Sequence, residues 1–195
     1  MTLQVIFIYG LLAWAPTFLV RSYGLSMTQA GLGFGAVMVV SGAGGVVAGG
    51  WVADRLFRRG FKDAHVRTVR LAGLLGGPFM IAMPLMPTAA WALTLMTPGL
   101  FLLAMNGIAG AGLQLLAPNP YRARMAAVYF FVASSVGLGI GPTVMALATD
   151  YLFHSDGAQR YSIALTAAVV MPLSVLTLTL GLKSFARSVA QAEAG

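Results

Sequence analysis

The fold is decided by the stretch from Gly31 to Arg59, which reads GLGFGAVMVVSGAGGVVAGGWVADRLFRR. Its glycines recur every three, four or seven residues, so that a helix places them on one smooth stripe: Gly31, Gly35, Gly42, Gly45 and Gly49. In water each glycine weakens a helix by roughly 1 kcal/mol relative to alanine, but in a bilayer a glycine stripe lets two backbones approach closely. The run ends at Asp54 and a cluster of arginines, as a helix does where it leaves the hydrocarbon. The stretch therefore predicts a membrane-spanning helix.

The composition of the whole chain agrees with a membrane protein. Of its 195 residues, 58% are hydrophobic and 9% are charged, and the mean hydropathy is +0.84, whereas a soluble domain carries about 25% charged residues. The formal net charge is +7, but the basic residues lie at the ends of apolar runs and form no basic face, which argues against nucleic-acid binding. The absence of cysteine excludes disulfides and thiolate metal sites.

Six apolar segments are each close to or above the roughly 20 residues with which a helix crosses a bilayer. They are Leu3–Val20, Met27–Val52, Val69–Met86, Ala90–Leu116, Met125–Ala148 and Tyr161–Leu182. Alternation with a period of two is absent, which argues against barrel strands. The sequence thus predicts an all-α polytopic membrane protein in which residues 1–195 form one six-helix bundle. Prolines inside the segments predict kinked helices.

The basic residues predict how the chain lies in the membrane. Ten of the twelve fall in the second connection, the fourth connection and the tail: Arg55, Arg58, Arg59, Lys62, Arg67, Arg70, Arg122, Arg124, Lys183 and Arg187. The other two, Arg21 and Arg160, fall in the first and fifth connections. Because cytoplasmic loops carry an excess of Lys and Arg, we expect both termini in the cytoplasm and the bundle in the inner (plasma) membrane.

The second and fifth predicted helices share a short sequence pattern. Gly45, Gly50 and Asp54 match Gly141, Ala146 and Asp150, with the same offsets of five and four residues. The two segments cross the membrane in opposite directions. The match therefore favours a 3+3 inverted repeat, from which many secondary transporters are built.

The chain offers no catalytic constellation. His65 and His154 fall in connections on opposite faces of the membrane. None of the five acidic residues is expected at mid-membrane, and Ser134 and Ser135 have no histidine or lysine at the same depth. We therefore expect neither an enzyme nor a metal or cofactor site. A clearly buried ionisable residue, which marks proton relays in membrane proteins, is missing as well.

Residues 50–59 resemble a loop motif of the major facilitator superfamily, Gly-x-x-x-Asp-Arg-x-Gly-Arg-Arg. The match consists of Gly50, Asp54, Arg55, Arg58 and Arg59, and Phe57 stands where the motif has its second glycine. Further stretches resemble the spinster-like branch of that superfamily, at the end of its seventh helix, its tenth-to-eleventh connection and its eleventh helix. They are residues 14–26 (WAPTFLVRSYGLS), Pro118, Arg122, Ala126 and the run from Gly137 through Pro142 to Asp150.

The resemblance implies that this chain is the carboxyl-terminal half of a transporter with twelve helices in two six-helix halves. Its partner would be an amino-terminal six-helix half outside this chain, and Asp54 would face the positive start of a helix there. The implied function is secondary active transport by alternating access around a mid-membrane site. The implied substrate is a small organic or an amphipathic, lipid-like solute.

By the same resemblance, helices one, two, four and five line the central cavity, while three and six face lipid. The candidate substrate-pathway residues are the neutral polar and aromatic residues at mid-depth: Tyr9, Trp14, Asn106, Gln114, Tyr129 and Ser134. Other interpretations stay open. An amide in a membrane helix often joins two helices, at about 0.6 kcal/mol, and Trp14 could instead anchor its helix at the membrane interface.

The role of the loop motif and the function of the chain each have alternative interpretations. Asp54 and its arginines form either a gating latch or a loop held by anionic lipid, at about 1 kcal/mol per cation. The chain could also be a non-transporting six-helix membrane remnant or an assembly partner. A third possibility is an organic-anion or sugar-acid carrier of the same superfamily, which requires cationic residues in the cavity that this chain does not supply at mid-depth.

Overall fold

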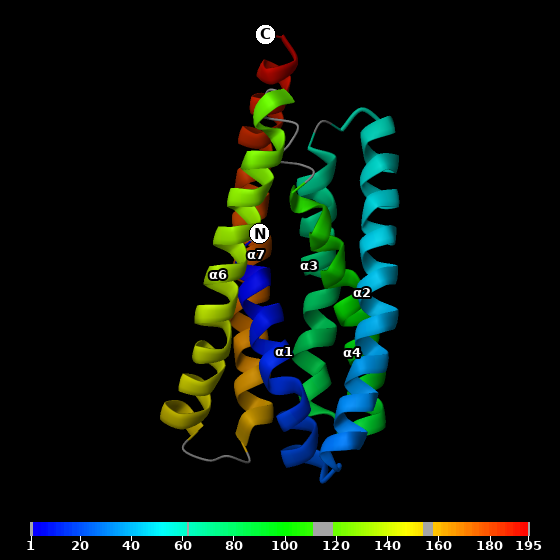
Figure 1. Ribbon diagram of the computed structural model, residues 1–195, viewed down its shortest axis with the longest axis vertical. Helices are drawn as coiled ribbons and strands as arrows, with labels where there is room; N and C mark the ends of the chain where they lie inside the picture. The colour runs from blue at the N-terminus through cyan, green and yellow to red at the C-terminus, as the bar shows by residue number, and fades with distance from the viewer. Residues whose placement is uncertain (1, 62, 111–118, 154–157, 195) are drawn as a thin grey trace.

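The computed structural model describes residues 2–61, 63–110, 119–153 and 158–194, and these form an all-α bundle without strands (Figure 1). The long helices are α1 (Thr2–Tyr23), α2 (Met27–Arg58), α3 (Ala64–Ala82), α4 (Ala89–Ala104), α6 (Arg122–Leu147) and α7 (Gln159–Ala194). Within the described residues, six helical stretches are long and apolar enough to cross a membrane. The predicted six-helix membrane bundle is confirmed.

Local sequence explains where α2 begins. Ser26 caps the helix: its Oγ accepts a hydrogen bond from the backbone N–H of Gln29 at 3.2 Å, and the Gln29 side chain accepts one from the Ser26 N–H at 3.0 Å. This reciprocal capping box satisfies two amides that the first turn leaves unpaired. Gly24 makes the turn from α1 with φ at 68°, in the left-handed region that glycine tolerates.

Two helices change their winding near their carboxyl ends. The predicted fourth segment was a continuous helix from Ala90 to Leu116, but α4 ends at Ala104 and passes into the 3₁₀-helix η2 (Met105–Ile108). Asn106 and Gly107, both poor helix formers, fall in this stretch. After α6 the chain continues as the π-helix η4 (Ala148–Phe153). Among the helices that the structure describes, five contain an internal proline: Pro16, Pro78, Pro98, Pro142 and Pro172.

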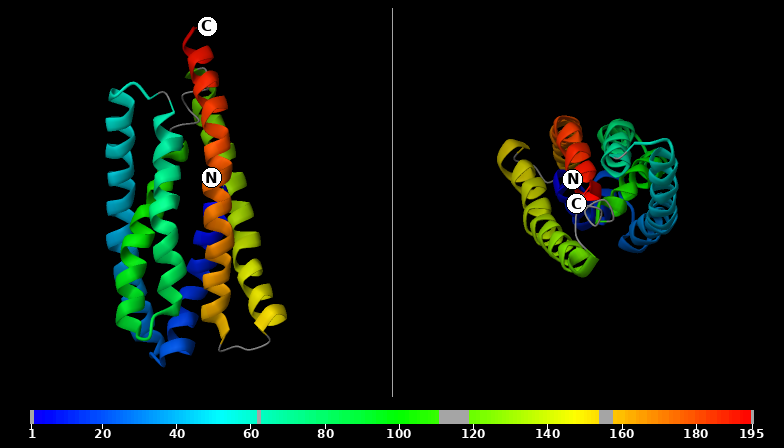
Figure 2. Two further views of the ribbon diagram at one scale, coloured as in Figure 1. Left: turned by 180° about the vertical axis from the view of Figure 1, so that it is seen from behind. Right: turned by 90° about the horizontal axis from the view of Figure 1, so that it is seen from above.

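The packing of the helices follows a two-fold pattern. The most extensive contacts join α1 to α6, α2 to α4 and α3 to α7. When α1, α2 and α3 are exchanged with α4, α6 and α7 in that order, the α1–α6 pair becomes the α2–α4 pair. The α3–α7 pair is unchanged by the exchange. The same exchange relates the α3–α4 contact to the α1–α7 contact. This is the pairing that the predicted 3+3 inverted repeat requires, and α2 and α6 lie on opposite sides of the bundle (Figure 2).

The expected glycine stripe on α2 is only half right. Gly45 is buried against α4, where an added methyl would overlap the carbonyl oxygen of Phe101, and Gly49 is buried against η2, where an added methyl would lie 2.9 Å from the Cα of Met105. Three further glycines meet nothing within 4 Å: Gly31, Gly35 and Gly42. The buried line of α2 begins instead one residue earlier, at Ala30, Phe34 and Val37. The stripe prediction failed there because glycine spacing alone does not tell which face of a long helix meets its neighbour.

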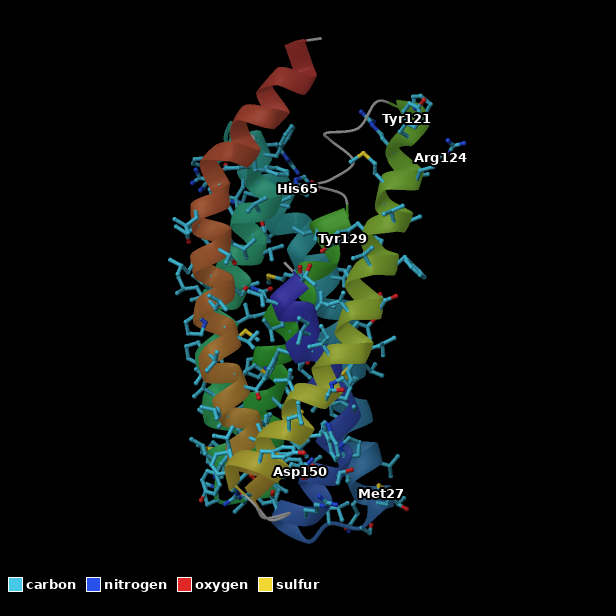
Figure 3. All side chains as sticks on the ribbon, turned by 90° about the vertical axis from the view of Figure 1, so that its left-hand side faces the viewer. Met27, His65, Tyr121, Arg124, Tyr129 and Asp150 are labelled. Atoms are coloured by element: carbon cyan, nitrogen blue, oxygen red, sulfur yellow. The ribbon has the colours of Figure 1, made fainter. Side chains whose placement is uncertain are left out.

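The two ends of the bundle differ in charge. The connection from α2 to α3 and the carboxyl terminus lie at one end, at the top of Figure 1. Arg124 lies at that end, whereas Met27 and Asp150 lie at the other (Figure 3). The connections that are rich in arginine are therefore at the same end of the molecule, as the positive-inside interpretation requires.

Candidate functional site

A cavity of about 240 Å³ lies between α1, the α4–η2 junction and α6. Its aromatic and polar lining residues are Tyr9, Asn106, Tyr129, Phe130 and Ser134, and its remaining walls are apolar side chains and Gly107. Tyr129 lies nearer the Arg124 end of the molecule than the Asp150 end (Figure 3). None of the described residues that line the cavity is charged.

Gly137 of α6 makes room for the Tyr9 ring. An added methyl at Gly137 would meet that ring at 2.5 Å, so the absent side chain lets Tyr9 lie against the α6 backbone. One turn earlier on α6, Ser134 accepts a hydrogen bond from the Tyr9 hydroxyl at 3.4 Å. Because this bond is long, both hydroxyls keep most of their capacity to bind other groups.

Asn106 is the most unusual polar residue of the cavity. It is only 7% exposed, yet neither its Oδ1 nor its Nδ2 has a hydrogen-bond partner among the described residues. A buried amide without partners costs about 1–3 kcal/mol for each unsatisfied group. Asn106 also lies in η2, where the helix tightens to 3₁₀ winding, a feature that often marks functional positions inside helices.

The aromatic wall comes from consecutive residues of α6. The rings of Tyr129 and Phe130 meet edge to face, with their centroids 5.4 Å apart. The Phe130 ring fills the space over Gly110, where an added methyl would lie 2.6 Å from it. Phe130 was not among the predicted residues. Gly110, four residues after Asn106, was the signal that could have identified it, because a glycine on that face leaves room for a large ring.

Four of the six candidate pathway residues therefore line one cavity: Tyr9, Asn106, Tyr129 and Ser134. Trp14 does not: its indole Nε1 donates to the carbonyl oxygen of Pro142 at 3.0 Å and ties α1 to α6. Gln114 lies outside the described residues. A role in substrate passage stays a prediction for all six. The structure also places η2 rather than α2 at the cavity wall, although Val46 of α2 packs against Gly107.

The loop motif lies at the Arg124 end of the bundle, and none of its residues lines the cavity. Asp54, Arg55, Arg58 and Arg59 are all exposed, and Gly50 meets nothing within 4 Å. Within the described residues no ion pair joins Asp54 to these arginines; Arg55 instead lies over the Trp51 ring at 5.4 Å. The gating latch stays a prediction. The charged groups of Asp54, Arg58 and Arg59 are exposed and can contact another protein segment.

The helix pairing and the inverted repeat agree with the resemblance: this chain has the fold of one six-helix half of a major facilitator transporter. The structure superposes with a TM-score of 0.67 on a solved bacterial homolog of the human lysosomal transporter Spinster, in an inward-facing and occupied conformation. The match covers 98% of this chain and 47% of that one, at 18% identity. The resemblance to the spinster-like branch is confirmed at the level of the fold.

A curated protein gives a second, sequence-level comparison. The chain is 27% identical over 169 residues to the uncharacterized transporter YybO of Bacillus subtilis strain 168. That alignment covers 83% of this chain and 37% of the relative. The chain thus spans less than half the length of both proteins. No family model matches the chain.

Proposed function

We propose that this chain is the carboxyl-terminal half of a secondary transporter that moves a small organic or amphipathic solute by alternating access. The observation that carries the proposal is the uncharged cavity between α1, η2 and α6, whose lining includes Tyr9, Asn106, Tyr129 and Ser134. The cavity is bounded by helices from both triplets of the inverted repeat. Rocking of this half against a partner half would expose a site between them to one side of the membrane and then to the other.

An amino-terminal six-helix half would complete the transporter. α2 and α6 are the least buried of the six membrane helices, and large apolar side chains on both are widely exposed, including Val39 at 73% and Phe131 at 74%. The open glycines Gly31, Gly35 and Gly42 give α2 a face that a further helix can approach closely. In this proposal Asp54 and its arginines form the latch against that half.

Uptake into liposomes tests the proposal. This chain is reconstituted alone and together with a co-expressed six-helix half, and both preparations are assayed with labelled amides, sugar acids and lysophospholipids under an inward proton gradient. We expect uptake only when both halves are present, because each half supplies one wall of the pathway. Strong uptake by this chain alone would contradict the half-transporter, and uptake by neither preparation favours the non-transporting alternative.

The proposed orientation, with the Arg124 end in the cytoplasm of the inner membrane, has its own test. The chain contains no cysteine, so single cysteines can be introduced at Met27 and Arg124, which lie at opposite ends (Figure 3). We expect a membrane-impermeant maleimide added to whole cells to label Met27→Cys and to leave Arg124→Cys unlabelled. The reverse pattern overturns the orientation.

A further inference from the structure

We propose that a groove between α3 and α7 binds an anionic phospholipid, with one acyl chain in the groove and the headgroup phosphate on Arg70. The lipid would belong to the membrane leaflet at the Arg124 end of the molecule. None of the residues that line this groove lines the cavity between α1, η2 and α6. The inference therefore does not depend on transport.

The groove lies where α3 and α7 run side by side along one face of the bundle (Figure 2, left). It has a volume of about 420 Å³ and is lined by residues 73–81 of α3 and residues 171–179 of α7. Gly77 is buried where the two helices meet, and an added methyl there would lie 3.2 Å from the Cβ of Met171. Because the helices touch along the base of the groove, it favours a single narrow chain as its occupant.

The side chains that line the groove suit a hydrocarbon chain. Leu74 and Leu176 are 53% and 55% exposed, and no charged side chain is among the described lining residues. The polar residue among them is Thr179, whose hydroxyl already donates to the Val175 carbonyl at 2.7 Å. A cavity of about 150 Å³ is sufficient for benzene, so the groove holds an acyl segment of more than six carbons.

The depth of the groove matches one membrane leaflet. Arg70 is the last charged residue of α3, and residues 71–86 carry no charge. The groove begins three residues after Arg70 and extends along α3 to Ile81, a rise of about 12 Å. One leaflet contributes about 15 Å to a hydrocarbon core of about 30 Å. The groove therefore begins where charge gives way to apolar sequence and covers most of one leaflet.

Arg70 lies on the same line of α3 as the groove. Leu74, Gly77 and Ile81 follow it at offsets of four, seven and eleven residues, which place all of them on one face of the helix. Side chains on a helix lean toward its N-terminus, and α3 begins at the Arg124 end (Figures 1 and 3). We therefore expect the guanidinium to extend from the groove toward the headgroups of that leaflet.

The Arg70 guanidinium has donors to offer a phosphate. Within the described residues no hydrogen bond or ion pair joins it to another group; its Nε is buried without a partner, and its terminal nitrogens are the accessible donors. Arg67, one turn earlier, is already paired with Asp63 at 2.7 Å. An arginine without a partner at the membrane boundary is costly, and a phosphate can accept two parallel hydrogen bonds from a guanidinium. A negatively charged headgroup therefore complements Arg70.

Native mass spectrometry of the chain released from micelles tests the inference. The probes are dioleoyl phosphatidylglycerol and dioleoyl phosphatidylcholine, which have the same acyl chains and differ in headgroup charge. We expect one phosphatidylglycerol to bind about 5-fold more tightly than phosphatidylcholine, as one cation near an anionic headgroup predicts. Arg70→Gln should abolish this preference.

Arg124→Gln is the matched control for the charge. It removes one cation at the same end of the molecule, from α6 rather than from α3 or α7, and should leave the preference for phosphatidylglycerol unchanged. Should Arg70→Gln fail to fold, as judged by circular dichroism, Arg70→Met takes its place, because it keeps an apolar stem of similar length.

Leu176→Trp tests the groove itself. The larger ring occupies space that the acyl chain would fill, so we expect binding of both lipids to weaken several-fold. Leu180→Trp is its control on the same helix: Leu180 is 72% exposed and does not line the groove. This control should leave the binding of both lipids unchanged.

Three results would overturn the inference. The first is equal binding of the two lipids by the parent chain, or a preference that Arg70→Gln and Arg124→Gln reduce equally. The second is binding that Leu176→Trp leaves unchanged. The third is a dimer without bound lipid that Leu176→Trp abolishes, which would assign the groove to a second copy of the chain. Uptake by the two reconstituted halves tests the proposed function separately, and neither result decides the other.

Discussion

At both the α1–α6 and the α2–α4 crossing, a glycine lets the two helices pack closely, but the cavity lies beside the α1–α6 crossing. At one, Gly141 of α6 lies against α1, where an added methyl would overlap the carbonyl oxygen of Ile6. At the other, Gly45 of α2 meets the carbonyl oxygen of Phe101 in the same way. These two glycines are the matching positions of the inverted repeat. The comparison shows that both triplets keep the same closely packed crossing.

The side chains beside the two crossings decide where space remains. Next to Gly141, Tyr9 lies over Gly137 and reaches Ser134, and the cavity opens above this pair. Next to Gly45, the Phe101 ring fills the space over Gly44, and the Ser41 hydroxyl donates to the Thr97 carbonyl. The repeat therefore maintains the helix crossing, and the residues that differ between the two triplets leave the cavity beside the α1–α6 crossing and fill the space beside the α2–α4 crossing.

The largest expected effect is at the glycines themselves. Gly45→Ala and Gly141→Ala should each lower the free energy of unfolding in detergent by about 2–3 kcal/mol, because the new methyl overlaps a backbone oxygen and forces the helices apart. Chemical denaturation followed by circular dichroism measures the change.

The chain offers matched controls for this prediction on the same two helices. Gly42→Ala and Gly139→Ala add the same methyl where nothing lies within 4 Å, so we expect no loss, or a gain of up to about 1 kcal/mol from helix propensity. Equal losses in all four variants would show that the two crossings are not the tight points of the bundle.

A smaller effect is expected where one side-chain hydrogen bond supports each crossing. Trp14→Phe removes the bond from the indole to the Pro142 carbonyl and part of the ring's packing, and should cost about 1–2 kcal/mol. Ser41→Ala removes the bond to Thr97 and should cost about 0.6 kcal/mol. The apparent melting temperature should fall more in Trp14→Phe than in Ser41→Ala. A larger fall for Ser41→Ala would contradict this ranking of the two contacts.

A still smaller change in stability is expected inside the cavity. Tyr9→Phe and Ser134→Ala each break the long bond between the two hydroxyls, so the free energy of unfolding should change by less than about 0.5 kcal/mol. Uptake by the two-half preparation should nevertheless fall several-fold if the hydroxyls contact solute. Unchanged uptake in both variants would remove these residues from the pathway.

The smallest stability change is expected at Asp54, near the end of α2, and at Asp150, in η4 after α6. Asp54 and Asp150 are exposed at matching positions of the repeat, and exposed charges contribute little to stability. We expect Asp54→Asn to lower uptake, since it removes the latch charge, and Asp150→Asn to leave uptake unchanged. Equal uptake in Asp54→Asn and the parent chain would remove the latch.

Much of the architecture could be predicted because the signals that define it are local. Hydropathy, helix length and the order of arginines along the chain predicted six membrane helices with the basic connections at one end. The match between Gly45 and Gly141 predicted the inverted repeat, because close packing of membrane helices requires a small residue at the same place in each triplet. The winding of η2 was missed, since a 3₁₀ stretch around Asn106 has no signal in hydropathy.

Contacts between helices depend on how each helix is rotated about its axis. The spacing of residues along one helix does not determine that rotation. This is why Gly31, Gly35 and Gly42 were placed with Gly45 on a packed stripe, and why the hydrogen bond from Trp14 to the Pro142 carbonyl was not predicted. Asn106 also shows what the sequence of a single helix leaves undetermined. Its residue type marked it as polar in an apolar helix, but the lack of a hydrogen-bond partner could be recognised only once the neighbouring helices were in position.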